Sequence, residues 1–204
     1  VGVPVRHPDL PAAIGDLLAR ERERTPFEVA RRESQESLEI GGVQVRVRLD
    51  RVDRLPDGGL AVLDYKTGRP GSPGWFDERL EEPQLPLYAT GLSQERVDGV
   101  ALVHVRPDGA TFKGVARRDG VLPGVDAFVH GHEAERFGDF DGLLAQWRRW
   151  LEALAEEIRV GEATVTPKKP PQTCRFCDLR ALCRVDERLG WHPHDAADPE
   201  ADGE

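Results

Sequence analysis

Two carboxylates and one amine stand at spacings that could hold a metal ion beside a phosphate group. Asp50 ends an alternating run of apolar and polar residues, and Asp64 and Lys66 stand two residues apart in the next apolar run. Because side chains alternate along a strand, Asp64 and Lys66 are expected on one face and Tyr65 on the other. Mg²⁺ prefers carboxylate oxygens, and a lysine beside the ion could hold a phosphate oxygen or help position a water.

Two strands joined by a tight turn are predicted to bring these residues together. Residues 43–50 alternate between apolar and polar side chains, residues 60–66 form the second strand, and Pro56-Asp-Gly-Gly59 is typical of a turn. Pairing of the strands would place Asp50 near Asp64. The alternative is a surface hairpin whose charges form exposed ion pairs, which contribute little to stability. The strand pattern alone favours neither interpretation.

Three blocks of sequence, taken together, resemble one nuclease family. The blocks are Arg48-Leu-Asp-Arg-Val-Asp-Arg54, Leu63-Asp-Tyr-Lys-Thr-Gly68 and Gln84-Leu-Pro-Leu-Tyr88-Ala. In this order, over roughly residues 26–188, they resemble the RecB-like branch of the PD-(D/E)xK nucleases, which includes the RecB and AddB nuclease domains of bacterial DNA-repair exonucleases. The resemblance implies an α/β (α+β) fold with a restriction-endonuclease-like core, in which helices flank a central mixed sheet.

The resemblance also implies roles for the residues of the two strands. Asp50, Asp64 and the backbone carbonyl of Tyr65 would hold Mg²⁺ or Mn²⁺. Lys66 would orient the attacking water or neutralise charge on the phosphate in the transition state. Glu33, on a strand predicted before this pair, could approach the metal, but a surface acid on an edge strand is the favoured interpretation.

Gln84 and Tyr88 complete the implied catalytic set. They lie four residues apart in a helix predicted over about residues 82–91, so they share a face, while Leu85 and Leu87 can serve the core. In the resembled family these two side chains help to fix the scissile phosphate, and both offer hydrogen-bond donors that could do so. The alternative is a packing helix in which both residues are incidental.

The implied activity is that of a Mg²⁺-dependent deoxyribonuclease, with an exonuclease favoured over an endonuclease. Its partner would be DNA, and it would act in repair or recombination as the nuclease part of a helicase–nuclease, with the helicase fused or separate. The alternative is a catalytically silent DNA-binding or interaction module of the same fold. Degenerate domains of this kind lose the Asp or Lys of the second strand, whereas this chain has Asp50, Asp64 and Lys66, which favours the enzyme.

All three cysteines lie within ten residues, at a C-x₂-C-x₅-C spacing: Cys174, Cys177 and Cys183. Three thiols cannot pair off internally, so the pattern favours a metal or iron–sulfur site over disulfides. The spacing resembles three ligands of the 4Fe–4S cluster in AddB-like nucleases, which implies a fourth ligand outside this chain. A Cys₃His zinc site completed by His192 or His194 is the alternative.

Composition and charge are compatible with a globular DNA-binding protein. The chain has 204 residues, 39% of them hydrophobic, and a net charge of −9. Residues 189–204 carry five acids and no Lys or Arg, whereas residues 44–69 and 165–188 each carry more basic than acidic side chains, which allows a local basic groove. The sequence shows neither an apolar run that could cross a membrane nor a secretory signal, so we expect a cytoplasmic protein.

We expect one nuclease domain over residues 1–188, with a cysteine-rich segment at 168–188, followed by an acidic flexible tail at 189–204. The chain contains no methionine, so we expect a piece of a longer protein whose nuclease domain begins upstream. The Gly/Pro-rich connection 67–83 carries Trp75 and Phe76, which could stack on unpaired bases or anchor the loop to the core.

The remaining elements are predicted from periodicity and turn residues. Further strands are expected at residues 27–33, 38–40, 97–105 and 111–117, and a helix at residues 10–24. A long helix should begin at Asp139 or Asp141 and end near residue 160. We expect its apolar stripe to face the core, and the stripe comprises Leu143, Leu144, Trp147, Trp150, Leu151, Leu154 and Ile158.

Overall fold

The structure is a computed structural model, and it describes residues 10–68, 71–92, 95–170, 172–175, 177–185, 187 and 190. The chain divides into two compact units, with the boundary between Arg159 and Val160. Within the described residues, no helix is long and apolar enough to cross a membrane.

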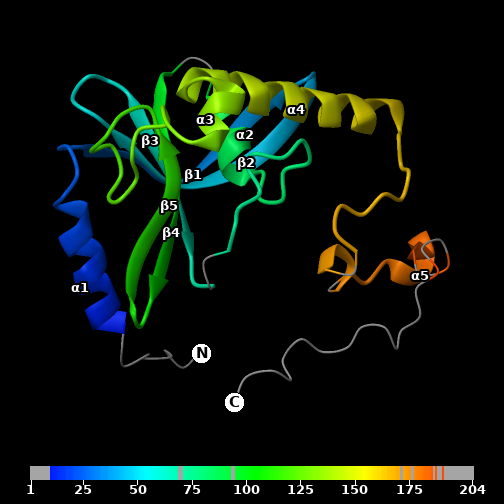
Figure 1. Cartoon of the computed structure of the whole chain (residues 1–204), viewed down its shortest axis with the longest axis horizontal. Helices are drawn as coiled ribbons and strands as arrows, with labels where there is room; N and C mark the ends of the chain where they lie inside the picture. The colour runs from blue at the N-terminus through cyan, green and yellow to red at the C-terminus, as the bar shows by residue number, and fades with distance from the viewer. Residues whose placement is uncertain are drawn as a thin grey trace. The chain divides into compact units, whose positions relative to one another are not determined.

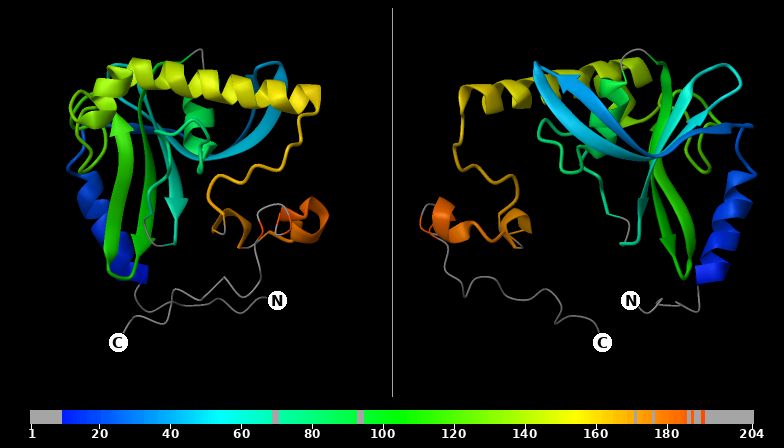
Figure 2. Two further views of the ribbon diagram at one scale, coloured as in Figure 1. Left: turned by 45° about the vertical axis from the view of Figure 1, so that its right-hand side comes forward. Right: turned by 180° about the vertical axis from the view of Figure 1, so that it is seen from behind.

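A mixed five-stranded sheet forms the centre of the first unit (Figures 1 and 2). The strand order follows the chain: β1 (Glu28–Ile40), β2 (Val43–Arg54), β3 (Leu60–Lys66), β4 (Val97–Arg106) and β5 (Gly109–Ala116). Neighbouring strands are antiparallel except β3 and β4, which are parallel and are joined through helix α2 (Gln84–Gly91). The predicted fold class, a mixed sheet flanked by helices, is therefore confirmed.

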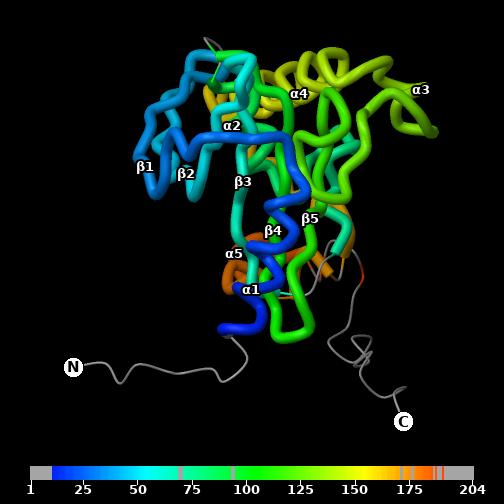
Figure 3. Tube along the Cα trace, turned by 90° about the vertical axis from the view of Figure 1, so that its left-hand side faces the viewer, coloured from blue at the N-terminus to red at the C-terminus, as the bar shows by residue number. Residues whose placement is uncertain are grey.

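Helices cover both faces of this sheet (Figure 3). Helix α1 (Leu10–Glu21) packs on one face, where Leu17 joins a core built around Leu63 and Val103. Helices α2 and α4 (Phe140–Val160) pack on the other face, around Val62 and Val100. A short helix, α3 (His132–Phe137), precedes α4. Because successive residues of β3 point into different cores, the strand reads as a continuous apolar run.

The first strand differs from the prediction, because the two strands expected at 27–33 and 38–40 are one strand. Its pairing with β2 keeps one register on either side of Glu33, from Arg32↔Arg51 to Ser34↔Leu49. Glu33 itself has a left-handed backbone with φ of 49°. The break in the apolar pattern at this point therefore reflects a local irregularity inside the strand rather than its end.

Helix α4 begins as predicted, because Asp139 Oδ1 accepts a hydrogen bond from the Gly142 N–H at 2.9 Å. Its apolar stripe is buried at Leu143, Trp147 and Leu151, as expected. Two further residues that we expected to face the core are exposed instead, Leu154 and Ile158.

Leu154 and Ile158 are exposed because only a small cluster of described residues packs beneath the last turns of α4. The β1–β2 hairpin packs there, through Ile40 and Val43 against Leu151 and Ala155, and Leu80 and Leu87 border the same small cluster. The hairpin turn comes so close that a Cβ on Gly41 would lie 2.9 Å from the Ala155 Cβ, and Gly41 has a φ of +55°. Leu151 and Ala155 fill this contact, so the rest of the stripe has no surface to cover.

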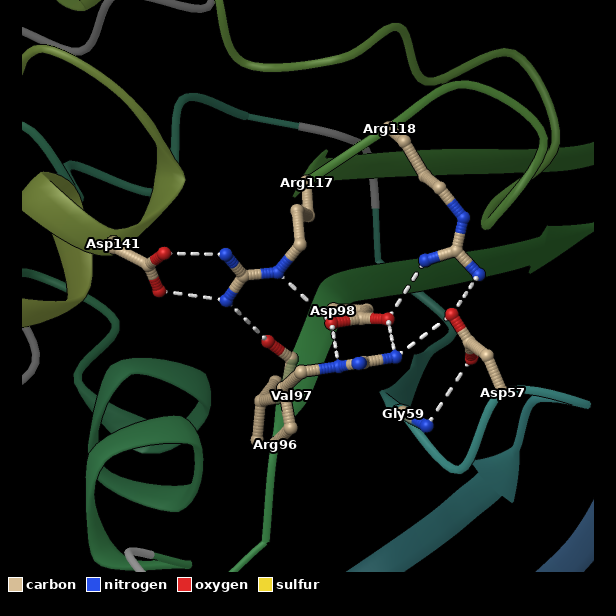
Figure 4. A network of polar contacts seen from close by, with 8 residues as sticks. All are labelled: Asp57, Gly59, Arg96, Val97, Asp98, Arg117, Arg118 and Asp141. Carbon is tan, nitrogen blue, oxygen red and sulfur yellow. Dashed lines mark hydrogen bonds and ion pairs between the residues drawn. The ribbon is translucent and has the colours of Figure 1, made fainter.

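A buried carboxylate ties α4 to the end of the sheet where β4 begins (Figure 4). Three arginines surround the Asp98 side chain at 2.7–2.9 Å, and they are Arg96, Arg117 and Arg118. Arg117 also pairs with Asp141 in the first turn of α4, and Arg96 and Arg118 both reach Asp57 in the β2–β3 turn. Breaking such a buried group of charges is costly, so it fixes three elements relative to one another.

The connection between β3 and α2 is anchored by tryptophan. Trp75 is buried, and its indole N–H donates to the Glu82 carbonyl at 2.9 Å. The Trp147 indole N–H of α4 donates to the Trp75 carbonyl at 2.7 Å, and the two rings meet edge to face. Phe76 stacks near Phe128. Both aromatic side chains of this connection therefore anchor it to the core.

The second unit contains a 3₁₀ turn, η1 (Gln172–Cys174), and a short helix, α5 (Arg180–Cys183). Cys174 is buried, Cys177 is exposed and Cys183 is half-buried. The predicted acidic tail at residues 189–204 lies outside the described residues apart from Gly190, and so do His192 and His194.

The tryptophan anchor gives a prediction about stability. Trp147→Phe keeps an aromatic ring but leaves the buried Trp75 carbonyl without its donor. This should lower the free energy of unfolding by about 1–3 kcal/mol. Trp150→Phe, in the same helix but only partly buried, is the matched control. Urea unfolding of both variants measures the difference, and equal losses would show that the hydrogen bond does not anchor the connection.

Candidate active site

The two acids of the predicted site lie where β2 and β3 part. The antiparallel ladder runs from Arg54↔Leu60 to Arg51↔Leu63, and Asp50 and Asp64 are the next residues on either strand. Beyond the ladder, the Tyr65 N–H donates to Asp50 Oδ2 at 2.9 Å. The Asp50 carboxylate thus takes the place of a backbone acceptor at the fork between the strands.

A twist in β2 sets the direction of Asp50. Leu49 and Val52 pack in the same core, although strict alternation would point them to opposite faces. The strand therefore turns over through Asp50 and Arg51, opposite the left-handed Glu33 of β1. Asp50 consequently remains half-buried at the fork rather than packed in either core.

Lys66 connects β3 with helix α2. Its Nζ lies 2.8 Å from Asp64 Oδ2 and donates to Gln84 Oε1 at 3.0 Å, so Asp64 and Lys66 share a face as predicted. The Tyr88 hydroxyl, one helical turn after Gln84, donates to the Arg48 carbonyl of β2 at 3.1 Å. Both helix residues therefore bond to the strands that carry the acids.

All five predicted catalytic side chains come together at this corner of the sheet. The negative charges of Asp50 and Asp64 both raise the pKa of Lys66 and that of Tyr88. Tyr65, whose backbone is the predicted third metal ligand, points its side chain to the other face, where its hydroxyl accepts from Arg51 at 3.0 Å.

Burial dominates the electrostatics of Asp64, which is only 4% exposed. Burial raises the pKa of this carboxyl above its ordinary value, the Lys66 ammonium opposes the shift, and the charge of Asp50 adds to it. Burial lowers the pKa of Lys66, but the hydrogen bond and charge of Asp64 together with the charges of Glu82 and Asp50 outweigh this and the pKa is raised, so Lys66 stays protonated. Burial also raises the pKa of Tyr88, which stays a neutral hydroxyl.

The donor set at the fork fits a hard divalent cation. Two carboxylates offer oxygen ligands. The Lys66 ammonium compensates only part of the cost of burying the Asp64 charge, because the pKa of Asp64 is still raised. Mg²⁺ and Mn²⁺ are held by few carboxylates and keep several waters. In the described part of the chain, no three or more His, Cys, Asp or Glu side chains form a group that could hold a metal, so other ligands would be backbone, water or substrate.

The same finding covers the cysteines of the second unit. Cys174, Cys177 and Cys183 all belong to the described residues, and their sulfurs do not form a metal-holding group. The Cys183 thiol instead lies 3.5 Å from the Arg180 carbonyl of its own helix. As placed here, the three thiols do not fit a preformed iron–sulfur or zinc site.

The second acid of the Leu-Asp-Arg-Val-Asp block has a different environment. Asp53 is fully buried and binds Arg24 at 2.8 Å and Arg51 at 2.7 Å. Both guanidinium groups also lie against the Phe27 ring. Asp53 therefore ties the segment after α1 to the sheet. Glu33, in contrast, is exposed and pairs with Arg48, as the surface interpretation predicts.

Sequence reasoning missed one residue beside the site. His104 lies on β4 directly opposite Lys66, is 4% exposed, and places its Nδ1 3.1 Å from the Gly68 carbonyl. The sequence pattern predicts the strand at residues 97–105 but gives no role to the histidine in it. A polar side chain inside an otherwise apolar buried strand is the signal that could have drawn attention to it.

Comparison with known proteins places the chain in a family. A profile of the PD-(D/E)XK nuclease superfamily matches residues 6–184. The chain belongs to the PD-(D/E)XK nuclease superfamily. No curated protein sequence matches it. Among 21 matching chains of solved structures, one titled "Crystal structure of SSO0001" is 17% identical with a TM-score of 0.37. That match covers 84% of this chain and 66% of the other.

The environments of Asp53 and Asp50 predict that removing the two carboxylates lowers the stability by different amounts. Asp53→Ala leaves buried Arg24 without its counter-charge and should lower the free energy of unfolding by about 3–5 kcal/mol. Asp50→Ala removes one hydrogen bond at a half-buried position and should cost about 1 kcal/mol. Chemical denaturation with EDTA present compares them, and similar losses would contradict the division between a structural and a site carboxylate.

The raised pKa of Asp64 gives a pH prediction. The folded state holds this proton more tightly than the unfolded chain, so the associated stability is present below the unfolded pKa and is lost as pH rises through the folded pKa. Asp64→Asn, which carries no charge, should therefore be more stable than wild type at about pH 7, with the difference shrinking toward about pH 4. Thermal unfolding with EDTA measures this, and a less stable variant at neutral pH would contradict it.

Proposed function

We propose that this chain is a Mg²⁺- or Mn²⁺-dependent deoxyribonuclease of the RecB-like branch of its superfamily. The single observation that supports it most is the meeting of Asp50, Asp64 and Lys66 at the β2–β3 fork, with Lys66 also bonded to Gln84 of α2. Hydrolysis of a phosphodiester needs a metal site, a cation beside the phosphate and a group that positions it, and this corner offers all three.

Asp50 and Asp64 would hold the ion, together with the backbone carbonyl of Tyr65. When bound, such an ion lowers the pKa of a coordinated water and stabilises charge on the phosphate. Lys66 would stabilise the negative charge that develops on the phosphate oxygens. Because Asp64 and Gln84 already hold its ammonium in place, little orientation is left for the reaction to achieve.

The two residues of α2 have different roles in this proposal. The oxygen of the Gln84 amide accepts from Lys66, and the Gln84 side chain also hydrogen-bonds to Tyr88, which leaves one amide N–H to donate to a phosphate oxygen. Tyr88 is 3% exposed and donates to the Arg48 carbonyl, two residues before Asp50. This contact supports a role in which Tyr88 holds β2 beside α2 and so fixes Asp50.

The finer parts of the proposal rest on the resemblance of the three sequence blocks. We propose an exonuclease that acts on DNA in the cytoplasm during repair or recombination, with a fused or separate helicase as partner. The 4Fe–4S assignment rests on the C-x₂-C-x₅-C spacing alone, with the fourth ligand outside this chain, and no step of the reaction passes through it.

Substitution of the ammonium separates catalysis from metal binding. Lys66→Ala should lower the turnover number for DNA cleavage by about 10²–10³-fold, since the lysine acts on charge that develops in the transition state. Asp64→Ala should abolish cleavage and weaken metal binding. Calorimetry with Mn²⁺ and cleavage of linear single- and double-stranded DNA measure the two effects. If Lys66→Ala loses metal affinity as fully as Asp64→Ala, the assigned role of Lys66 is wrong, and a folded wild type that leaves DNA intact favours the silent module.

The cysteines allow a separate test. Anaerobically isolated protein that extends upstream of Val1 should contain iron and sulfide, and Cys177→Ser should lose both while Mn²⁺ binding at the fork persists. Stoichiometric zinc without iron, lost on substitution of His192 or His194, would replace the cluster by a Cys₃His site.

A further inference from the structure

His104 is a buried titratable side chain that the proposed reaction does not use. It lies on β4, and the parallel register aligns it with Lys66 on β3. Aligned residues of neighbouring strands point to the same face of a sheet. His104 therefore belongs to the face that carries Asp64, Lys66 and helix α2, although it comes from a different strand.

Its hydrogen bond fixes which ring nitrogen carries a proton. Nδ1 lies 3.1 Å from the Gly68 carbonyl, which can only accept, so Nδ1 is the donor. In the neutral ring Nε2 is then a bare acceptor. Nε2 is buried and has no hydrogen-bond partner among the residues that the structure describes.

Gly68 is where this bond acts on the active site. β3 ends at Lys66, and Gly68 lies two residues further on, where the chain leaves the sheet. Further along the described part of this connection, the Gly71 carbonyl accepts from Lys113 of β5 at 3.2 Å. Side chains of β4 and β5 thus hold the carbonyls of Gly68 and Gly71, and the His104 contact is the one nearer to Lys66.

The choice of histidine here has a cost. A buried acceptor without a partner destabilises a fold, because the hydrogen bonds it made to water are not replaced. Leu102 and Val100 occupy the same face of β4 without such a cost. An apolar residue at position 104 would avoid it too, but could not bind the Gly68 carbonyl. The hydrogen bond through Nδ1 is therefore the property that distinguishes histidine at this position.

We propose that His104 is a positioning residue for cleavage, which holds the Gly68 carbonyl and so fixes the chain beyond β3 with the Lys66 ammonium between Asp64 and Gln84. The inference rests on the proposed nuclease function of this site. His104 acts through Lys66 and makes no contact with the phosphate. Its loss should lower turnover and leave substrate affinity nearly unchanged.

Two substitutions at position 104 distinguish the role of Nδ1 from that of Nε2. In His104→Asn the amide N–H₂ can take the place of Nδ1 and donate to Gly68, whereas in His104→Gln the amide reaches the position of Nε2 instead. We expect His104→Asn to keep turnover close to wild type. His104→Gln should lose about 10–100-fold in turnover with little change in KM, which is the effect of a small misplacement of a catalytic group. His132→Gln, with a side chain 78% exposed, is the control.

A second readout does not depend on activity. The NMR signal of the Lys66 side-chain amine, recorded with EDTA, should match wild type in His104→Asn and shift in His104→Gln, with thermal unfolding confirming that both variants are folded. If both variants match wild type, or if Asn disturbs the signal as much as Gln, the positioning role is wrong. If the signals follow the prediction but wild type does not cleave DNA, the proposed function fails while the positioning of Lys66 by His104 through Gly68 stands.

Discussion

The parting of β2 from β3 is the constraint on which the rest of this structure depends. Every backbone N–H that leaves a ladder needs another acceptor, and the Tyr65 N–H finds it in the Asp50 carboxylate. One hydrogen bond thereby fixes an acid at the fork and closes the end of the ladder. The residues on either side of Tyr65 are Asp64 and Lys66, so the same bond sets the geometry of the proposed catalytic group.

The buried carboxylates of this fold differ in how their charge is compensated. Asp53 and Asp98, both fully buried, are each bound by two or three arginines that join separate elements of the fold. Asp64 is almost as deeply buried but has one ammonium, and burial raises its pKa. The carboxylates that stabilise the fold are thus neutralised by the protein, whereas the carboxylate of the proposed site is left to be neutralised by a cation.

Helix α2 reaches the fork because its connection to β3 is held at several points. The carbonyls of Gly68 and Trp75 accept from side chains of β4 and α4, and the Trp75 indole closes back onto Glu82 just before the helix. Gln84 follows directly and meets Lys66. A long connection rich in glycine and proline is often mobile. Here its hydrogen bonds to the core restrict it and so fix the position of the first residue of α2.

The sequence by itself determined the features that depend on local period: strands β2 to β5, helices α2 and α4, the shared face of Asp64 and Lys66, and the pairing of the strands that carry Asp50 and Asp64. Tertiary structure decided what depends on residues far apart in the chain. Arg24 makes Asp53 structural, the hairpin tip leaves Ile158 exposed, and Gly68 gives His104 a partner. The physical reason is that periodicity records which side of an element is buried, whereas a hydrogen bond or ion pair between distant residues leaves no period in the sequence.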